Sequence, residues 1–221
     1  MLFFVKFAPS STIKYQIISQ MKQNIAILAS GNGTNAENFM NFFENSEIAQ
    51  ISLILSDKKS AFVLERAKNH HIPSFSFTKS EFFNAYESIN TLPEYKVLSI
   101  IEKYDIDIII LAGFLLKVPD YILKRFPGKI FNIHPALLPN YGGKGMYGMR
   151  VHKAVISAKE KESGITIHLI DENYDQGSII YQAKCHINEQ DTPETLASKI
   201  HELEKQYPVV INNYLVKHSI L

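Results

Sequence analysis

An asparagine and a histidine, Asn132 and His134, lie two positions apart at the end of an apolar run and just before a proline. On a β-strand, side chains two residues apart point to the same face, so the amide and the imidazole can be aimed at one reacting atom. Pro135 and Pro139 restrict the loop that follows. The pair suits stabilisation of a developing oxyanion. The alternative is that Asn132 caps a turn and His134 is a hydrogen-bonded histidine at a strand end.

A second candidate site is the loop Ser30-Gly31-Asn32-Gly33-Thr34-Asn35-Ala36. It follows the first predicted strand and opens the first predicted helix, where free backbone N–H groups and the positive helix end attract an anion. The spacing also fits Gly-x-Gly-x-x-Ala, with Asp57 after the next strand, so a dinucleotide, another phosphate ligand and a plain tight turn remain open. Thr34 and Asn35, polar side chains at the helix start, favour a single phosphate group. The lysines after Asp57 favour it too, because they indicate a solvated turn.

An acidic group for this chemistry can come from the loop 171–177, which has three carboxylates. Loop carboxylates are usually solvated, but a carboxylate beside a histidine favours the charged ring and orients it. Asp175 is the preferred partner of His134, because Gly177 allows the backbone to turn back towards the site. His168, on the strand before this loop, is interpreted as a core or structural histidine.

The histidines do not indicate a metal site. His134, His152 and His168 lack close ligand spacing, and Asp175 is their only obvious acidic partner, so no metal is expected. The single cysteine, Cys185, excludes an intrachain disulfide and a multi-cysteine zinc site, and it fits a reducing cytoplasm.

The composition is that of an ordinary globular protein. With 221 residues and 46% hydrophobic content, the chain can bury a substantial core within one domain. Lys and Arg total 23 against 22 Asp and Glu, so no overall basic field indicates a nucleic-acid partner. No apolar run approaches the roughly 18 residues of a membrane span. A cytoplasmic protein that acts on small molecules, as a monomer or homodimer, is expected.

The elements that must position these residues follow an alternating order. Strands are predicted at 24–29, 51–55, 73–77, 106–112 and 129–133, and helices at 36–43, 62–69 and 93–104. Such alternation predicts parallel βαβ units, and the continuously apolar run 106–112 is typical of a strand at the sheet centre.

The second half of the chain changes character. Segments 164–170 and 178–187 alternate as in an antiparallel pair, and Thr192 begins a last helix that Pro208 kinks or interrupts. We therefore predict an α/β, Rossmann-like three-layer fold whose mostly parallel sheet has an antiparallel C-terminal portion. One domain is expected at 23–221, preceded by a loose N-terminal extension at 1–22.

Four motifs together resemble the phosphoribosylglycinamide formyltransferase family over about residues 23–215. They are Ser30-Gly31-Asn32-Gly33-Thr34-Asn35, Leu111-Ala112-Gly113-Phe114, Asn132-Ile133-His134-Pro135-Ala136-Leu137-Leu138-Pro139 and Asp175-x-Gly177. The resemblance implies the formyltransferase fold and transfer of a formyl group from 10-formyltetrahydrofolate to the amine of glycinamide ribonucleotide in purine synthesis.

The resemblance also implies roles for individual residues. The catalytic group would be Asn132, His134 and Asp175. The substrate would contact Gly33, Thr34, Asn35, Lys129 and Glu204, and the folate would contact Leu115, Leu116, Lys117, Val118 and Asn132.

Three departures from the family concern substrate contacts. An arginine common in the segment matching 81–86 is missing, and another family arginine falls on Lys129, which keeps the charge but loses the planar fork. The glycine-rich loop 142–150 is longer than usual, so Lys144 or Arg150 is a candidate replacement. Glu202 remains an alternative to Glu204.

Other functions stay open at this stage. A hydrolase could release formate from the same folate, and a related formyltransferase could act on another amine. Such hydrolases generally have a further N-terminal domain, and methionyl-tRNA formyltransferases a basic C-terminal one, neither of which is expected here. A non-catalytic phosphate-binding module would bind without turnover.

Overall fold

The computed structural model describes residues 22–84, 96–172 and 175–218. Seven strands form one sheet in the order β3-β2-β1-β4-β5-β6-β7. The strands are β1 Gln23–Leu28, β2 Ala49–Ser56, β3 Ser74–Ser76, β4 Ile108–Leu111, β5 Ile130–His134, β6 Glu162–Leu169 and β7 Ile179–His186. Strands β1 to β5 pair with one another in parallel, whereas β6 is antiparallel to both β5 and β7. The predicted mixed α/β sheet is confirmed.

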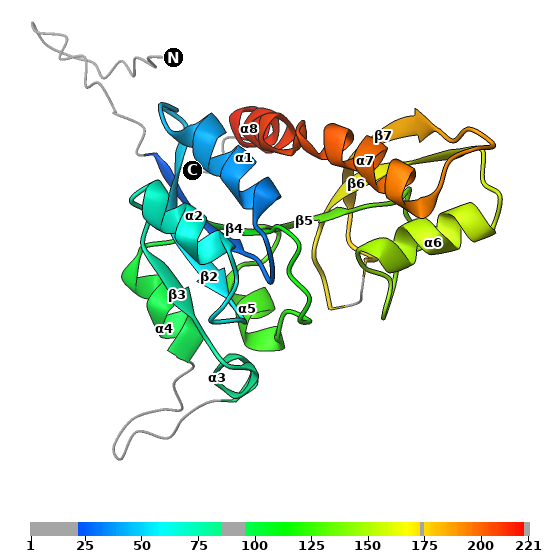
Figure 1. Ribbon diagram of the computed structural model, residues 1–221. Coiled ribbons are helices and arrows are strands. Elements are labelled where there is room, and N and C mark those ends of the chain that lie inside the picture. Colours follow the sequence, from blue (N-terminus) through cyan, green and yellow to red (C-terminus); the bar gives the residue numbers. More distant parts are fainter. Residues whose placement is uncertain (1–21, 85–95, 173–174, 219–221) are drawn as a thin grey trace, which may run out of the picture.

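Helices cover both faces of the sheet (Figure 1). They are α1 Thr34–Phe43, α2 Val63–Asn69, α3 Lys79–Phe83, α4 Lys96–Lys103, α5 Asp120–Arg125, α6 Met149–Ser157, α7 Pro193–Glu204 and α8 Tyr207–His218. The core beneath α1, α2, α6, α7 and α8 includes Ile25 and Ile27, whereas the core beneath α3, α4 and α5 includes Ala26 and Leu28. Successive β1 side chains thus enter opposite cores, which gives the predicted three layers.

The central strand is β4, as its apolar sequence predicted. All four of its residues are buried, since helices lie on both faces and β1 and β5 flank it. On α1 the buried residues Ala36, Phe39, Met40 and Phe43 recur at helical spacing, which explains why this segment is a helix packed on the sheet.

Some elements differ from the predicted ranges. Three helices, α3, α5 and α6, lie in segments for which the sequence indicated none. The predicted last helix is two helices, because α7 ends at Glu204 and Pro208 lies in the first turn of α8, where its missing N–H is not needed. The start of the helix predicted at 93–104 and the proposed extension at 1–22 fall almost wholly outside the described residues.

This topology determines where functional loops lie. The carboxyl ends of parallel strands β1, β4 and β5 meet at one edge of the sheet, which is where ligands bind in folds of this class. The loop 29–33, the segment 112–118 and the end of β5 all lie at that edge. The direction of β6 is reversed, so His168 pairs with Asn132 and Thr166 pairs with His134.

Candidate active site

Asn132 faces a second histidine rather than an acidic group. Its Nδ2 lies 3.1 Å from Nε2 of His168, and Nδ1 of His168 lies 3.0 Å from the carbonyl oxygen of Leu169. A carbonyl can only accept, so Nδ1 of His168 donates and its Nε2 accepts an N–H from Asn132. Burial lowers the pKa of His168, against the opposing charge of Asp175, and so favours this neutral ring.

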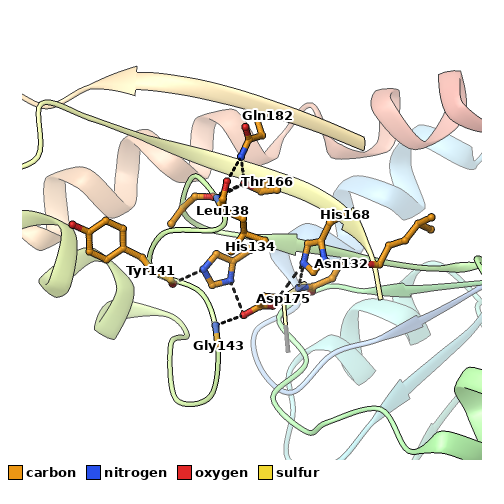
Figure 2. Close-up of polar contacts among 11 residues, drawn as sticks. Asn132, His134, Leu138, Tyr141, Gly143, Thr166, His168, Asp175 and Gln182 are labelled. Atoms are coloured by element: carbon orange, nitrogen blue, oxygen red, sulfur yellow. Dashed lines mark hydrogen bonds and ion pairs between the residues drawn. The ribbon is translucent and has the colours of Figure 1, made fainter. Parts of the chain in front are cut away.

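Both ring nitrogens of His134 face a polar partner (Figure 2). Its Nε2 lies 2.8 Å from the carbonyl oxygen of Tyr141 and therefore donates to it. Its Nδ1 lies 3.7 Å from Oδ2 of Asp175. Because Nε2 is engaged with the backbone, Nδ1 is the ring atom that faces the carboxylate.

Asp175 lies between the two histidines (Figure 2). Its Oδ1 is 3.7 Å from Nε2 of His168, and its Oδ2 accepts a 2.8 Å hydrogen bond from the Gly143 N–H. Only 14% of the side chain is exposed. The structure thus brings Asp175 to His134, as the sequence predicted. A Cβ at Gly177 would lie 1.8 Å from the Leu169 carbonyl oxygen, so glycine is required for the close return of this loop.

The loop after His134 is fixed by a buried hydroxyl. The hydroxyl of Thr166 donates to the Ala136 carbonyl oxygen at 2.7 Å and accepts the Leu138 N–H at 2.9 Å. Gln182 Nε2 donates to the Leu138 carbonyl oxygen at 3.0 Å and to the Thr166 hydroxyl at 2.9 Å. These contacts position the chain between His134 and Tyr141, the two ends of the histidine hydrogen bond.

The glycine loop forms the start of α1. Gly33 is the N-cap with a φ of 75°, and its carbonyl accepts the Glu37 N–H at 2.9 Å. A Cβ at Gly33 would lie 2.5 Å from the side chain of Val63, so glycine is needed here for both backbone conformation and space. Thr34 and Asn35 occupy the first turn, as predicted, where helical N–H groups have no intrahelical partner.

Of the other residues predicted to contact the substrate, Glu204 lies beside the glycine loop and Lys129 does not. Asn35 Nδ2 donates to Glu204 Oε2 at 3.1 Å, so Glu204 on α7 lies beside the start of α1. Glu204 is 7% exposed, whereas Glu202 forms an exposed ion pair with Lys205, which favours Glu204 as the glutamate of this region. Lys129 is not brought to this group. It precedes β5, at the sheet edge opposite the glycine loop.

The segment 115–118 is tied to the glycine loop through Ser30. The Leu115 N–H donates to the Ser30 hydroxyl at 3.0 Å, and the Ser30 N–H donates to the Gly113 carbonyl oxygen at 3.1 Å. Leu115 is exposed, Leu116 packs partly against the core and Val118 is buried. The structure therefore places the segment predicted to bind folate beside the segment predicted to bind phosphate.

Some residues of the site were not identified from the sequence. The sequence predicts a core or structural role for His168, and its full burial agrees with that, but the ring also lies 3.1 Å from Asn132 and 3.7 Å from Asp175. The antiparallel register of β5 and β6 is the signal that could have found it. Within the described ranges 22–84, 96–172 and 175–218, no group of three or more His, Cys, Asp or Glu residues is arranged to hold a metal ion.

Comparison with known proteins agrees with this geometry. The family described as formyl transferase matches residues 23–211. Phosphoribosylglycinamide formyltransferase of Bacillus subtilis is 37% identical over 195 residues, which are 87% of this chain and 95% of the relative. The crystal structure of phosphoribosylglycinamide formyltransferase from Bacillus halodurans has a TM-score of 0.76 and 35% identity, and covers 89% of this chain and 97% of the other.

Plant relatives are longer than the matched region. The chloroplastic phosphoribosylglycinamide formyltransferase of Arabidopsis thaliana is 35% identical over 192 residues, and the match spans 86% of this chain but only 64% of the relative. The match to the Vigna unguiculata protein also spans 64% of that relative. The extent of the family match and the identity to full-length bacterial relatives show that the chain belongs to the formyl transferase family.

Proposed function

We propose that this protein transfers the formyl group of 10-formyltetrahydrofolate to the amine of phosphoribosylglycinamide, as a step of purine biosynthesis. The observation that carries the proposal is the meeting of Asn132, His134 and Asp175 at the sheet edge that also holds the glycine loop. A reacting centre next to an anion site fits a substrate with both an amine and a phosphate. The relatives' names support the same reaction.

Asn132 is proposed to stabilise the oxyanion. Attack of the amine on the formyl carbon gives a tetrahedral intermediate whose oxygen is negatively charged. One N–H of the Asn132 amide is held by His168, and the other is available to donate to that oxygen. Preorganised donors of this kind contribute because they need no reorientation as the charge develops.

His134 is proposed to add positive charge near the oxyanion, and Asp175 is proposed to accept the proton of the attacking amine. Nε2 of His134 carries the proton that it donates to the Tyr141 carbonyl. A second proton would therefore bind at Nδ1, the atom that faces the Asp175 carboxylate. The resulting imidazolium is stabilised by that carboxylate and adds a positive charge near the oxyanion. The same carboxylate can accept, through a water molecule, the proton that the attacking amine must lose, and this proton can return to N10 of the folate as the bond between N10 and the formyl carbon breaks and tetrahydrofolate leaves.

The glycine loop is proposed to bind the phosphate of the ribonucleotide. The N–H groups of Gly33, Thr34 and Asn35 lie at the positive end of α1, which favours an anion. The Glu204 carboxylate beside Asn35 can only accept hydrogen bonds when charged and repels a phosphate. We therefore assign Glu204 to hydroxyl or amine groups of the substrate and the loop N–H groups to its phosphate.

The folate is proposed to lie along residues 115–118 and to reach Asn132. Leu115 and Leu116 offer apolar contacts, while Lys117 and Val118 add backbone groups of the same segment. Lys129 is left out of the proposed substrate site because it lies at the opposite edge of the sheet. No helix of the described ranges is long and apolar enough to cross a membrane. A cytoplasmic location and a monomeric or homodimeric state stay predictions.

The test is formyl transfer from 10-formyltetrahydrofolate, followed by the absorbance of the deformylated folate, with and without glycinamide ribonucleotide. We expect turnover only when the ribonucleotide is present. Equal turnover without the ribonucleotide would instead identify a hydrolase. Absence of turnover in both reactions, with folate binding retained, would indicate a different formyl acceptor.

A further inference from the structure

Arg66, a residue of α2 outside the predicted site, forms hydrogen bonds to the glycine loop. Nε of Arg66, on α2, donates to the Asn32 carbonyl oxygen at 2.8 Å, and its Nη2 donates to the Asn32 side-chain oxygen at 3.3 Å. The guanidinium also lies 4.9 Å from the centre of the Phe62 ring. Only 16% of the Arg66 side chain is exposed. Two donors of one rigid, planar group thus fix both the backbone and the side chain of a single loop residue.

The same helix holds the loop at two more points. The Val63 N–H donates to the Gly31 carbonyl oxygen at 3.2 Å, and the Val63 side chain fills the space next to Gly33. Asn32 lies between these two glycines and is exposed, so its backbone has freedom unless Arg66 restrains it. The direction of the following N–H groups, at Gly33 and Thr34, depends on that restraint.

Arg66 also changes the electrostatics of the loop. It forms an ion pair with Glu37, the acidic residue in the first turn of α1. An unpaired carboxylate at this helix end would compete with an incoming phosphate for the positive field of the helix and repel it. The Arg66 guanidinium offsets that charge without occupying the loop N–H groups.

We propose that Arg66 is a positioning residue for phosphate recognition. It acts through Asn32 and Glu37 to hold the loop 31–35 open to an anion. The inference rests on the proposed function for the identity of the substrate, but the binding of phosphate by this loop can be measured without it. Arg66 is not a catalytic residue, and its loss leaves the group formed by Asn132, His134 and Asp175 intact.

The kinetic test compares Arg66→Ala with the control variant Arg125→Ala. Arg125 also pairs with a glutamate, Glu102 at 3.1 Å, and lies over a phenylalanine ring at 5.3 Å, but it precedes β5 at the opposite sheet edge. We expect Arg66→Ala to raise KM for glycinamide ribonucleotide about tenfold, the equivalent of one charged hydrogen bond. For Arg66→Ala, we expect kcat and the KM for the folate to stay near the values of Arg125→Ala.

Two further variants separate charge from geometry. Arg66→Lys keeps the charge beside Glu37 but not the paired donors to Asn32, so we expect a KM for the ribonucleotide between those of wild type and Arg66→Ala. Adding Glu37→Gln to Arg66→Ala removes the uncompensated carboxylate and should recover part of the loss. A KM for Arg66→Ala equal to that of Arg125→Ala would overturn the proposal.

A second measurement needs no turnover. Amide hydrogen exchange of peptides covering 31–37 is recorded by mass spectrometry with and without inorganic phosphate. We expect phosphate to slow exchange in wild type and Arg125→Ala, and to have little effect in Arg66→Ala, whose loop exchanges faster from the start. Equal protection in wild type and Arg66→Ala, or none in wild type, would refute the role of Arg66. If wild type transfers no formyl group, the proposed reaction fails while this comparison still decides the inference.

Discussion

Replacing Asp175 with asparagine tests whether its negative charge drives the proposed reaction. The Asp175 carboxylate lies 3.7 Å from a ring nitrogen of His134 and 3.7 Å from one of His168. Asparagine retains an oxygen that can accept the Gly143 N–H, and it tolerates the positive φ of 54° found at this position. The substitution therefore removes the charge with little change in shape.

The expected magnitude follows from the distance and the burial. Opposite unit charges about 4 Å apart attract by roughly 4 kcal/mol at an effective dielectric constant of about 20. If half of this attraction acts on the His134 imidazolium in the transition state, kcat falls about 30-fold, and if all of it acts, about 10³-fold. The side chain is mostly buried, so screening by water and salt is weak.

The assay is the absorbance of the deformylated folate at saturating concentrations of both substrates. Glu160→Gln serves as the control, because it removes an exposed carboxylate that accepts a 2.7 Å hydrogen bond from the hydroxyl of Tyr141. We expect the control to retain kcat and Asp175→Asn to retain KM for the ribonucleotide. A kcat for Asp175→Asn within threefold of wild type would refute the role assigned to its charge.

Three further substitutions test other parts of the site. Gly33→Ala places a Cβ 2.5 Å from Val63 at a φ of 75°, so urea titration should show an unfolding free energy lower by about 1–3 kcal/mol, with a raised KM for the ribonucleotide. Asn132→Ala removes the proposed oxyanion donor and should lower kcat about 10²- to 10³-fold; a near-normal kcat would contradict the assignment. Burial lowers the pKa of His152, so the unfolded chain binds more protons below about pH 6.5 and acid destabilises the fold. His152→Leu should flatten this loss between pH 7 and 5 in urea titrations, and an unchanged slope would count against it.

The main strands could be predicted from the sequence because their apolar runs are separated by turn residues. The segment ending in Leu111 is apolar throughout, and its central place follows from burial on both faces. The short helix α5 has one fully buried residue, Ile122, and α3 has one, Phe82. One buried position gives no periodicity, so these helices depend on tertiary contacts that a sequence pattern does not contain.

The candidate site was predictable where its residues share a short motif or lie on a loop with a distinctive glycine. Asn132 and His134 share a strand face, and Asp175 belongs to a loop whose close return requires a glycine, Gly177. The contacts of His168 and Thr166 depend on the register of an antiparallel strand that begins almost thirty residues later. A shift of that register by one residue would turn both side chains to the other face, so only the folded sheet reveals them.

The burial of His168 has a consequence for the direction of the Asn132 amide. A neutral His168 donates from Nδ1 to the Leu169 carbonyl, and its Nε2 must accept, so it selects the amide orientation with Nδ2 towards the ring. A protonated ring would donate from Nε2 and favour the opposite orientation, with the Asn132 oxygen in that place. The burial that lowers the pKa of His168 thus keeps Nδ2 of Asn132 towards the ring and leaves its second N–H for the oxyanion of the proposed reaction, even though Asp175 lies close enough to oppose that effect.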